Sequence, residues 1–298
     1  MPFLVAGVAV FALLELFWQA PSREILLLLR LPRVLNALWV GTLLGMSGAV
    51  FQNVLRNPLA EPYTLGFSAS TAMGVLVGMA LGLSLSGSVF LGIVSGVGGM
   101  LLLVRLARTS LELILAGVAL NFFAGALLVT LQSVVEPFRV YAMVRWSMGN
   151  LATVGYVLPL VALGLTLVWA VWIYRQRHVL MLASLGEDPA RSLGLDWEAL
   201  IRRVVVFTGA LLSLSVARVG PIGFVGLVVP HLVRLGGQRS MGALLLRSAF
   251  LGSLFLLFSD FVAHLPPREI PVGAITALVG TPIFVILLVR LAHQGGVS

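Results

Sequence analysis

The chain has 298 residues, of which 59% are hydrophobic and only 10% are charged, and its mean hydropathy is +1.08. A soluble domain of this length carries far more charged surface, so the composition excludes a soluble globular protein. At roughly 1.5 Å rise per residue, about 20 apolar residues cross a bilayer core, where every backbone amide must be hydrogen-bonded within the protein. The long apolar runs do not alternate as barrel strands do, so they predict an all-α, polytopic membrane helix bundle.

The chain contains no cysteine and no lysine, and all 19 of its basic residues are arginines. The absence of cysteine excludes thiolate metal sites and thiol catalysis. A phosphate-binding P-loop needs a lysine at the β- and γ-phosphates, so any ATP that drives this protein must bind to another polypeptide. The net charge of +8 is interpreted as arginine at lipid head groups and on the cytoplasmic side, rather than as a nucleic-acid surface.

The first apolar run, Pro2–Trp18, lacks the positive region and the cleavage pattern of a signal peptide, so it is predicted to be a retained first span. Ser22 is a suitable N-cap for a short interfacial helix over Pro21–Leu29. Hydropathy allows nine or ten spans, because Gly220–Gly223 barely separates two runs, and the expected number is ten. The further spans are expected at 34–54, 64–84, 86–106, 112–132, 155–174, 203–219, 222–236, 243–264 and 270–291.

The arginines indicate the orientation of the spans, because cytoplasmic loops are enriched in basic residues. With both termini in the cytoplasm, the inner side holds twelve arginines and the outer side seven, which favours this orientation. The outer seven are Arg23, Arg30, Arg33, Arg139, Arg145, Arg218 and Arg268. Glycines that repeat every four residues, as Gly41 with Gly45 and Gly74 with Gly78, predict close packing between helices.

Acidic residues are few, and only Glu15 and Asp260 are expected at membrane depth, each near the outer end of a span. Carriers coupled to protons or sodium usually place carboxylates or broken helices near the midplane, which makes ion coupling the less favoured hypothesis. His231 follows Pro230 and is interpreted as a packing or hydrogen-bonding residue rather than a metal ligand. No nucleophile–base pair and no metal-ligand spacing is present, so neither catalytic nor metal-binding residues are predicted.

A long polar interval, residues 175–203, is expected on the cytoplasmic face. Asp188 can cap a short helix there, and Gly194 can end it. Asp196 can cap a second short helix over residues 197–200. Two short capped helices predict a rigid knob, and an ordinary solvated connection is the alternative.

A second polar segment breaks the helix twice within six residues, at Asn57-Pro58 and at Glu61-Pro62. Proline disfavours helical geometry in the residue before it, so the segment is stiff. It is interpreted as an inner-side re-entry between two spans, and a plain reverse turn is the alternative.

Seven motifs, in order along essentially the whole chain, resemble the FecCD family, the permeases of type II ABC importers for iron–siderophores, haem and cobalamin. They are RLPR (30–33), SGAVFQNVLRNPLAEPYTLGFS (47–68), LAGVALN (115–121), WSMGNL (146–151), LGEDPARSLG (185–194), GPIGFVGLVVPHLVR (220–234) and EIPVGAITALVGTPIF (269–284). The resemblance implies that residues 1–298 form a single transmembrane permease domain with the ten-span fold of the cobalamin permease. It also implies a multi-pass protein of the bacterial cytoplasmic (inner) membrane with both termini cytoplasmic.

The resemblance implies a division of labour among several proteins. Two copies of the chain are expected to pair as a homodimer in membrane lipid, with the translocation path between them. Two ABC ATPase subunits would bind ATP and magnesium below, and a periplasmic or lipid-anchored substrate-binding protein would dock outside. This chain itself is expected to bind no cofactor and no nucleic acid and not to be an enzyme. The expected cargo is cobalamin, haem or a ferric siderophore; molybdate or tungstate, or an ion-coupled secondary transporter, are the alternatives.

The resemblance also assigns roles to residues. Residues 185–200 would be cytoplasmic coupling helices that grip the ATPase through Leu185, Gly186, Glu187, Ala190, Arg191, Leu193 and Gly194. The inner gate would consist of Asn57, Pro58, Leu59, Thr109 and Ser110. Arg30, Arg33 and Arg268 would pair with glutamates on the binding protein, which sets orientation and encounter rate more than affinity. Where family members often carry an arginine after the span-nine aspartate, this chain has His264, and Arg268 is the expected replacement.

Overall fold

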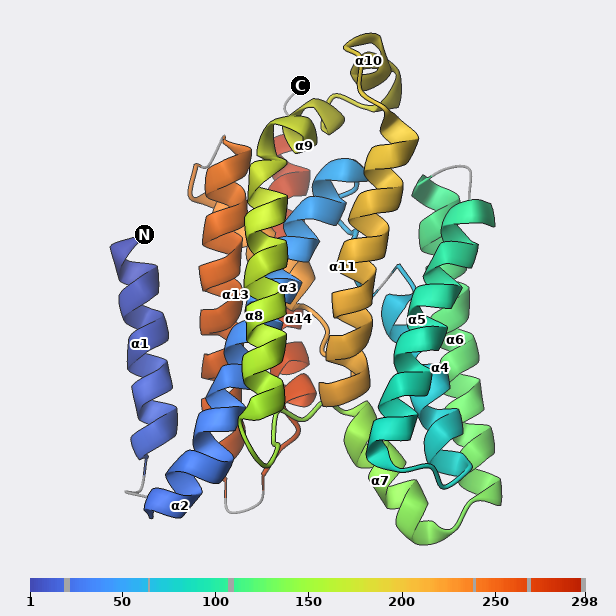
Figure 1. The fold of residues 1–298 in the computed structure, drawn as a ribbon. Coiled ribbons are helices and arrows are strands. Elements are labelled where there is room, and N and C mark those ends of the chain that lie inside the picture. The colour runs from blue at the N-terminus through green and yellow to red at the C-terminus, as the bar shows by residue number, and fades with distance from the viewer. Residues whose placement is uncertain (19–21, 64, 107–109, 238–239, 267–268, 296–298) are drawn as a thin grey trace.

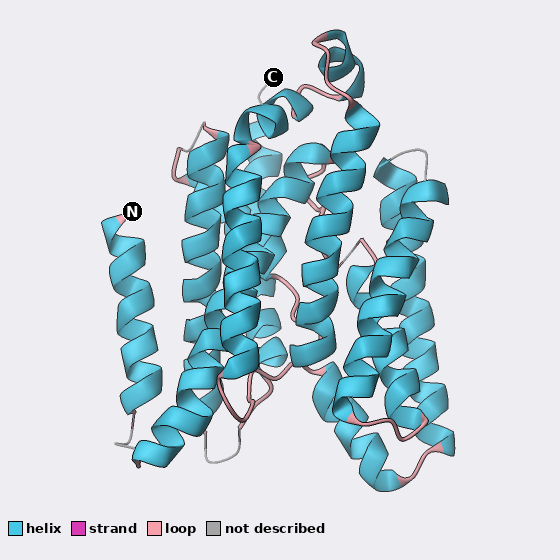
Figure 2. Cartoon of the chain, viewed as in Figure 1, coloured by secondary structure: helices cyan, strands magenta, loops and turns pink. Residues whose placement is uncertain are grey.

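The computed structural model describes the chain except for residues 19–21, 64, 107–109, 238–239, 267–268 and 296–298. The described residues form helices and loops without a β-strand, which confirms the all-α prediction (Figures 1 and 2). In chain order the helices are α1 (Pro2–Phe17), α2 (Arg23–Ile25), η1 (Leu26–Arg30), α3 (Leu31–Val54), α4 (Phe67–Ala80), α5 (Leu85–Leu106), α6 (Ser110–Val134), α7 (Pro137–Ser147), α8 (Val157–Arg175), α9 (Arg177–Ala183), α10 (Glu187–Ser192), α11 (Trp197–Val219), α12 (Val225–Leu235), α13 (Met241–His264) and α14 (Val272–Gly295).

Seven helical segments among the described residues are long and apolar enough to cross a membrane. Three shorter apolar helices, α1, α4 and α12, accompany them, so the described residues contain ten apolar helical segments. Each of the ten overlaps one predicted span. The weak break at Gly220–Gly223 does separate two helices, α11 and α12. Seven segments have the length of a span, so the count of ten spans stays a prediction.

The centre of the bundle is a continuous helical segment, Arg23–Val54, and 83% of the residues in its most apolar stretch are buried. It consists of α2, the π-helical turn η1 and α3. The prediction of a separate interfacial helix over Pro21–Leu29 is therefore wrong. The predicted cap is present, because Ser22 Oγ accepts a hydrogen bond from the amide of Ile25 at 3.4 Å, but η1 joins α2 to α3 without a break.

Glycine lets the backbones of α3 and α13 touch. A Cβ on Gly41 would lie 2.6 Å from the carbonyl oxygen of Gly252, and one on Gly45 would lie 2.2 Å from that of Ser248. The same holds between α4 and α5, where a Cβ on Gly74 would lie 2.5 Å from the carbonyl oxygen of Leu91. The predicted glycine packing is confirmed at both contacts.

The two ends of the bundle differ. Figure 1 shows α10 and the C-terminal end at one end, and α2 and α7 at the opposite end. We call the first the inner end and the second the outer end. α7 was not predicted; it starts at Pro137, and Arg139 donates from Nη1 to the carbonyl oxygen of Ala80 at 3.1 Å, where α4 ends. Arg23 and Arg139, both predicted to be outer arginines, lie at this end.

Candidate functional site

The polar interval at the inner end forms a projecting structure, residues 185–196, which we call the inner knob (Figure 1). Its helix α10 has Gly186 as N-cap, so the prediction that Asp188 caps it is wrong. Gly194, with φ of +85°, follows the helix end as predicted. Asp196 is confirmed as an N-cap, because Oδ1 accepts from the amide of Ala199 at 2.9 Å. The helix that it caps is not short, however: it is the membrane-spanning α11.

One arginine holds the knob together from outside. Arg191 Nη2 donates to Glu187 Oε1 at 2.9 Å, across one turn of α10, and also to Glu198 at the start of α11. These hydrogen bonds, first to Glu198 and then to Glu187, raise the pKa of Arg191. Arg191 therefore remains charged at any physiological pH while it ties α10 to α11.

The other predicted coupling residues divide into three groups. Leu185 and Leu193 are 51% and 61% exposed, which leaves apolar side chains on a projecting polar segment. Ala190 is fully buried within the knob, and Gly186 and Gly194 shape the backbone of the knob. Exposed apolar side chains beside ion-paired polar ones are typical of a surface that contacts a protein partner. The coupling role itself stays a prediction.

The predicted inner-gate turn lies at the end of α3. Asn57 Oδ1 accepts from the amide of Leu59 at 2.8 Å, and the carbonyl oxygen of Asn57 accepts from Ala60 at 3.1 Å, which fixes a tight turn around Pro58. Leu59 is 45% exposed. Of the other two predicted gate residues, Ser110 is the first residue of α6 and Thr109 lies outside the described residues.

The same loop contains a buried carboxylate, that of Glu61, which was not among the acidic residues predicted to lie inside the bundle. Glu61 is 6% exposed, and its side chain accepts hydrogen bonds from the backbone amides of Phe224 and Leu227. Phe224 is the N-cap residue of α12 and Leu227 lies in its first turn, where amides have no partner within the helix. Glu61 thus caps a helix that begins inside the bundle. The sequence feature that could have predicted this capping role is a glutamate between two prolines in an otherwise apolar stretch.

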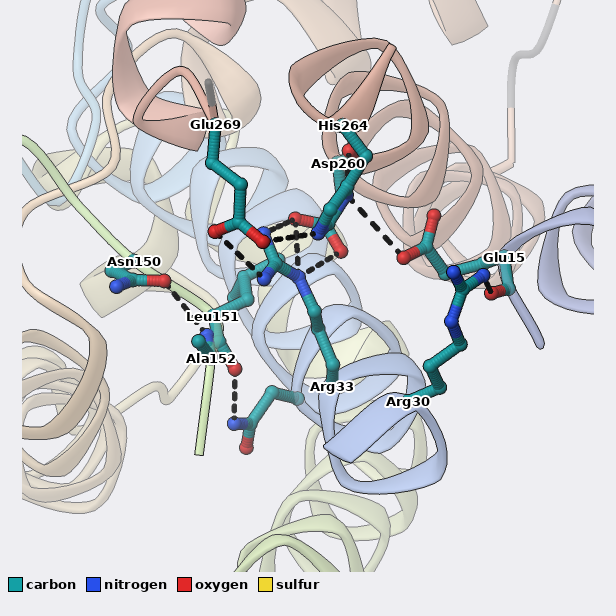
Figure 3. Close-up of polar contacts among 10 residues, drawn as sticks. Glu15, Arg30, Arg33, Asn150, Leu151, Ala152, Asp260, His264 and Glu269 are labelled. Carbon is teal, nitrogen blue, oxygen red and sulfur yellow. Dashed lines mark hydrogen bonds and ion pairs between the residues drawn. The ribbon is translucent and has the colours of Figure 1, made fainter. Parts of the chain in front are cut away.

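The outer end holds a buried ion pair between α3 and α13 (Figure 3). Arg33 Nε lies 2.8 Å from Asp260 Oδ2 and 3.1 Å from Oδ1, and Nη2 lies 2.9 Å from Oδ1. The Asp260 side chain is completely buried and that of Arg33 is 9% exposed. Paired charge-assisted hydrogen bonds of this kind fix geometry as well as charge.

Further charged groups surround this pair (Figure 3). His264 Nδ1 lies 2.7 Å from the backbone oxygen of Asp260 and 3.4 Å from Glu15 Oε1, while Nε2 lies 3.4 Å from Glu269 Oε1. Arg30 Nη1 donates to the backbone oxygen of Glu15 at 2.7 Å. The cluster therefore connects α1, η1, α3, α13 and the segment before α14.

A cavity of about 380 Å³ opens beside this cluster. Its lining combines the charged side chains with the segment before α8; it consists of Glu15, Ile25, Leu29, Arg30, Arg33, Ala152, Thr153, Val154, His264 and Glu269. Ligand atoms of Glu15, Asp260 and His264 lie within 4.8 Å of one another, a spacing that a metal ion could bridge. The guanidinium of Arg33 already binds both carboxylate oxygens of Asp260 and supplies the positive charge that a metal ion would bring. We therefore interpret these three residues as part of an ion-pair network.

The predicted docking arginines are not equivalent in the structure. Arg33 points inward to Asp260, so in this conformation its guanidinium does not reach a partner on the outer surface. Arg30 is half-buried beside the cavity, and Arg268 lies outside the described residues. Glu269, half-exposed, lies 3.5 Å from Arg33 Nη1. Docking of the binding protein stays a prediction, and the structure favours a substitution of Arg30, rather than of Arg33, to test it.

A membrane helix bundle with a projecting knob at one end and a charged cluster at the other is typical of a transmembrane permease. The chain belongs to the FecCD transport family, whose profile matches residues 4–290. It is 38% identical over 273 residues to the vitamin B12 import system permease protein BtuC of Salmonella arizonae, and 38% identical over 276 residues to that of Salmonella typhimurium. Each match covers 89% of this chain and 83% of the relative.

Two solved structures share the fold. A metal-chelate type ABC transporter in an inward-facing conformation matches with a TM-score of 0.89 and 33% identity, over 97% of both chains. PsaBC from Streptococcus pneumoniae in complex with Fab matches with a TM-score of 0.65 and 16% identity, over 96% of this chain and 94% of that one. The predicted family is thereby confirmed, and the chain is a multi-pass permease of a type II ABC importer.

Proposed function

We propose that this permease moves a metal chelate into the cell, and that the chelate is cobalamin, haem or a ferric siderophore. The observation that carries the proposal is the 38% identity to vitamin B12 import permeases over 89% of the chain. The match to a metal-chelate type ABC transporter supports the same class of cargo. Molybdate or tungstate is the alternative cargo.

In this proposal, ATP hydrolysis by a separate subunit supplies the energy for transport. Two ABC ATPases bind at the inner end, where the knob presents Leu185 and Leu193 around the Arg191 ion pairs. A second copy of this chain completes the translocation path, and a substrate-binding protein delivers the chelate at the outer end, near the cavity beside Arg30. Both termini lie on the same side as the ATPases.

Reconstitution with the ATPase and the binding protein tests the proposal. The binding protein, loaded in turn with cobalamin, haem, a ferric siderophore or molybdate, is added to the complex, and the rate of ATP hydrolysis is measured. Stimulation and vesicle uptake with one chelate only would identify the cargo. Stimulation by molybdate alone would overturn the chelate assignment. Uptake driven by a proton or sodium gradient without nucleotide would instead show an ion-coupled carrier.

A further inference from the structure

The inner end of α3 finishes in an unusual way. Arg56 follows the helix with φ of +49°, a left-handed conformation that glycine adopts readily and that costs other residues energy. The amide of Asn57 donates to the carbonyl oxygen of Gln52 at 3.2 Å, a bond that commonly accompanies a left-handed glycine at a helix end. An arginine at this position departs from the preference for glycine, and residues in such unfavourable backbone conformations are found mostly at functional sites.

The side chain of Arg56 reaches the base of the inner knob. A Cβ on Gly186 would lie 2.7 Å from Nη1 of Arg56, so the guanidinium fills the space that a side chain at position 186 would need. Gly186 itself has φ of +110°, is buried, and is the N-cap of α10. Two residues with left-handed backbones, one on each segment, therefore meet at this contact.

A second contact reinforces the first, one turn earlier on α3. Asn53 Nδ2 donates to the carbonyl oxygen of Leu180 at 2.6 Å, which joins α3 to α9 immediately before the knob. On the other side of Arg56, the chain enters the turn of Asn57–Leu59 at once. The knob and the turn are thus separated by a single side chain.

We infer that Arg56 is a positioning residue that connects the inner knob to the turn at Asn57–Leu59. When the ATPase displaces α10, the guanidinium packed on Gly186 moves the end of α3 and the turn that follows. The inference deepens the proposed function and rests on it, since it assumes that an ATPase binds the knob. The contact needs the length of the Arg56 side chain and the bare backbone of Gly186.

Arg56→Gly separates this positioning role from a purely structural one. A structural role predicts a loss of stability, whereas the positioning role predicts a loss of transport without a loss of stability. Glycine suits the left-handed position, so the variant should unfold at the same or a higher temperature than the wild type. The contact with Gly186 is lost, so substrate transported per ATP hydrolysed by the reconstituted complex should fall by at least about five-fold. Arg56→Lys, which keeps the reach and the charge, should restore part of the ratio. Arg175→Ala, which removes an exposed arginine from the same end, is the control.

Hydrogen exchange of the turn gives a readout that needs no transported substrate. Binding of the cognate ABC ATPase should change exchange of the Leu59 and Ala60 amides by about five-fold or more in the wild type, and by less than about two-fold in Arg56→Gly. An Arg56→Gly complex with the wild-type ratio of transport to hydrolysis and the wild-type exchange response would overturn the inference. A wild-type chain that binds no ATPase and shows no ATP-driven uptake would instead overturn the proposed function.

Discussion

Replacing Arg33 with alanine should destabilise the protein strongly, because it leaves the buried carboxylate of Asp260 without its partner. Three hydrogen bonds of 2.8 to 3.1 Å join the two side chains, and Asp260 is completely buried. Removing one member of a buried ion pair typically costs about 3–5 kcal/mol. We expect a loss of about 3 kcal/mol, the lower end of that range, because Arg33 lines the neighbouring cavity and its removal can admit water to the carboxylate of Asp260.

The assay is denaturant unfolding of the purified permease in detergent micelles, with Arg33→Ala, Asp260→Ala and the double variant Arg33→Met/Asp260→Leu. Each single variant should lose about 3 kcal/mol, whereas the double variant, which replaces both charges by apolar groups, should lose less than about 1 kcal/mol. If Arg33→Ala unfolds within about 1 kcal/mol of the wild type, the pair does not hold α3 to α13 and the reasoning fails.

Other predictions test the two ends and the interior. Arg191→Glu places three carboxylates together where α10 meets α11 and should abolish uptake while the elution volume of the permease in size-exclusion chromatography stays unchanged; wild-type uptake would rule out the coupling role. Arg30→Glu should raise the concentration of binding protein needed for half-maximal ATPase stimulation about tenfold, most visibly at low salt, and an unchanged titration would count against docking there. Gly252→Leu should prevent folding or cost at least about 3 kcal/mol, because even its Cβ strikes a backbone oxygen at 2.2 Å, whereas Gly125→Ala, a helix position with open space around it, should not lower the stability. Glu61→Ala should cost about 1–3 kcal/mol by leaving the buried amides at the start of α12 without an acceptor, and a change below about 0.5 kcal/mol in the same unfolding assay would exclude the capping role.

The placement of the apolar helices could be predicted because lipid imposes one simple requirement on the chain. An apolar run of sufficient length must become a helix, and the ten predicted runs correspond to ten helices. The helix ends were harder to predict, since local capping signals compete with packing. Ser22 does cap α2, yet the π-helical turn continues the helix into α3. α7 escaped prediction because its residues, Pro137–Ser147, are too polar and too few to resemble a span.

The polar contacts could be predicted only in part, because they join residues far apart in the chain. Asp260 was expected at depth near the end of a span, and it is buried near the end of α13. Nothing local to Arg33, however, reveals that a residue 227 positions away will bind it. Arg33 therefore resembled a surface arginine. Glu61 was read as part of a turn for the same reason, since its partners belong to α12.

Arg33 near the beginning of α3 and Arg56 just past its end take part in contacts at opposite faces of the bundle. At about 1.5 Å per residue, the 23 steps between them span roughly 35 Å of one buried helix. If the helix transmits displacement from either end, thermodynamic linkage makes the transmission reciprocal. Any factor by which a docked binding protein changes the affinity of the permease for the ATPase must then equal the factor by which the ATPase changes its affinity for the binding protein. The two fold-changes in affinity, measured separately on opposite sides of a membrane, would have to agree.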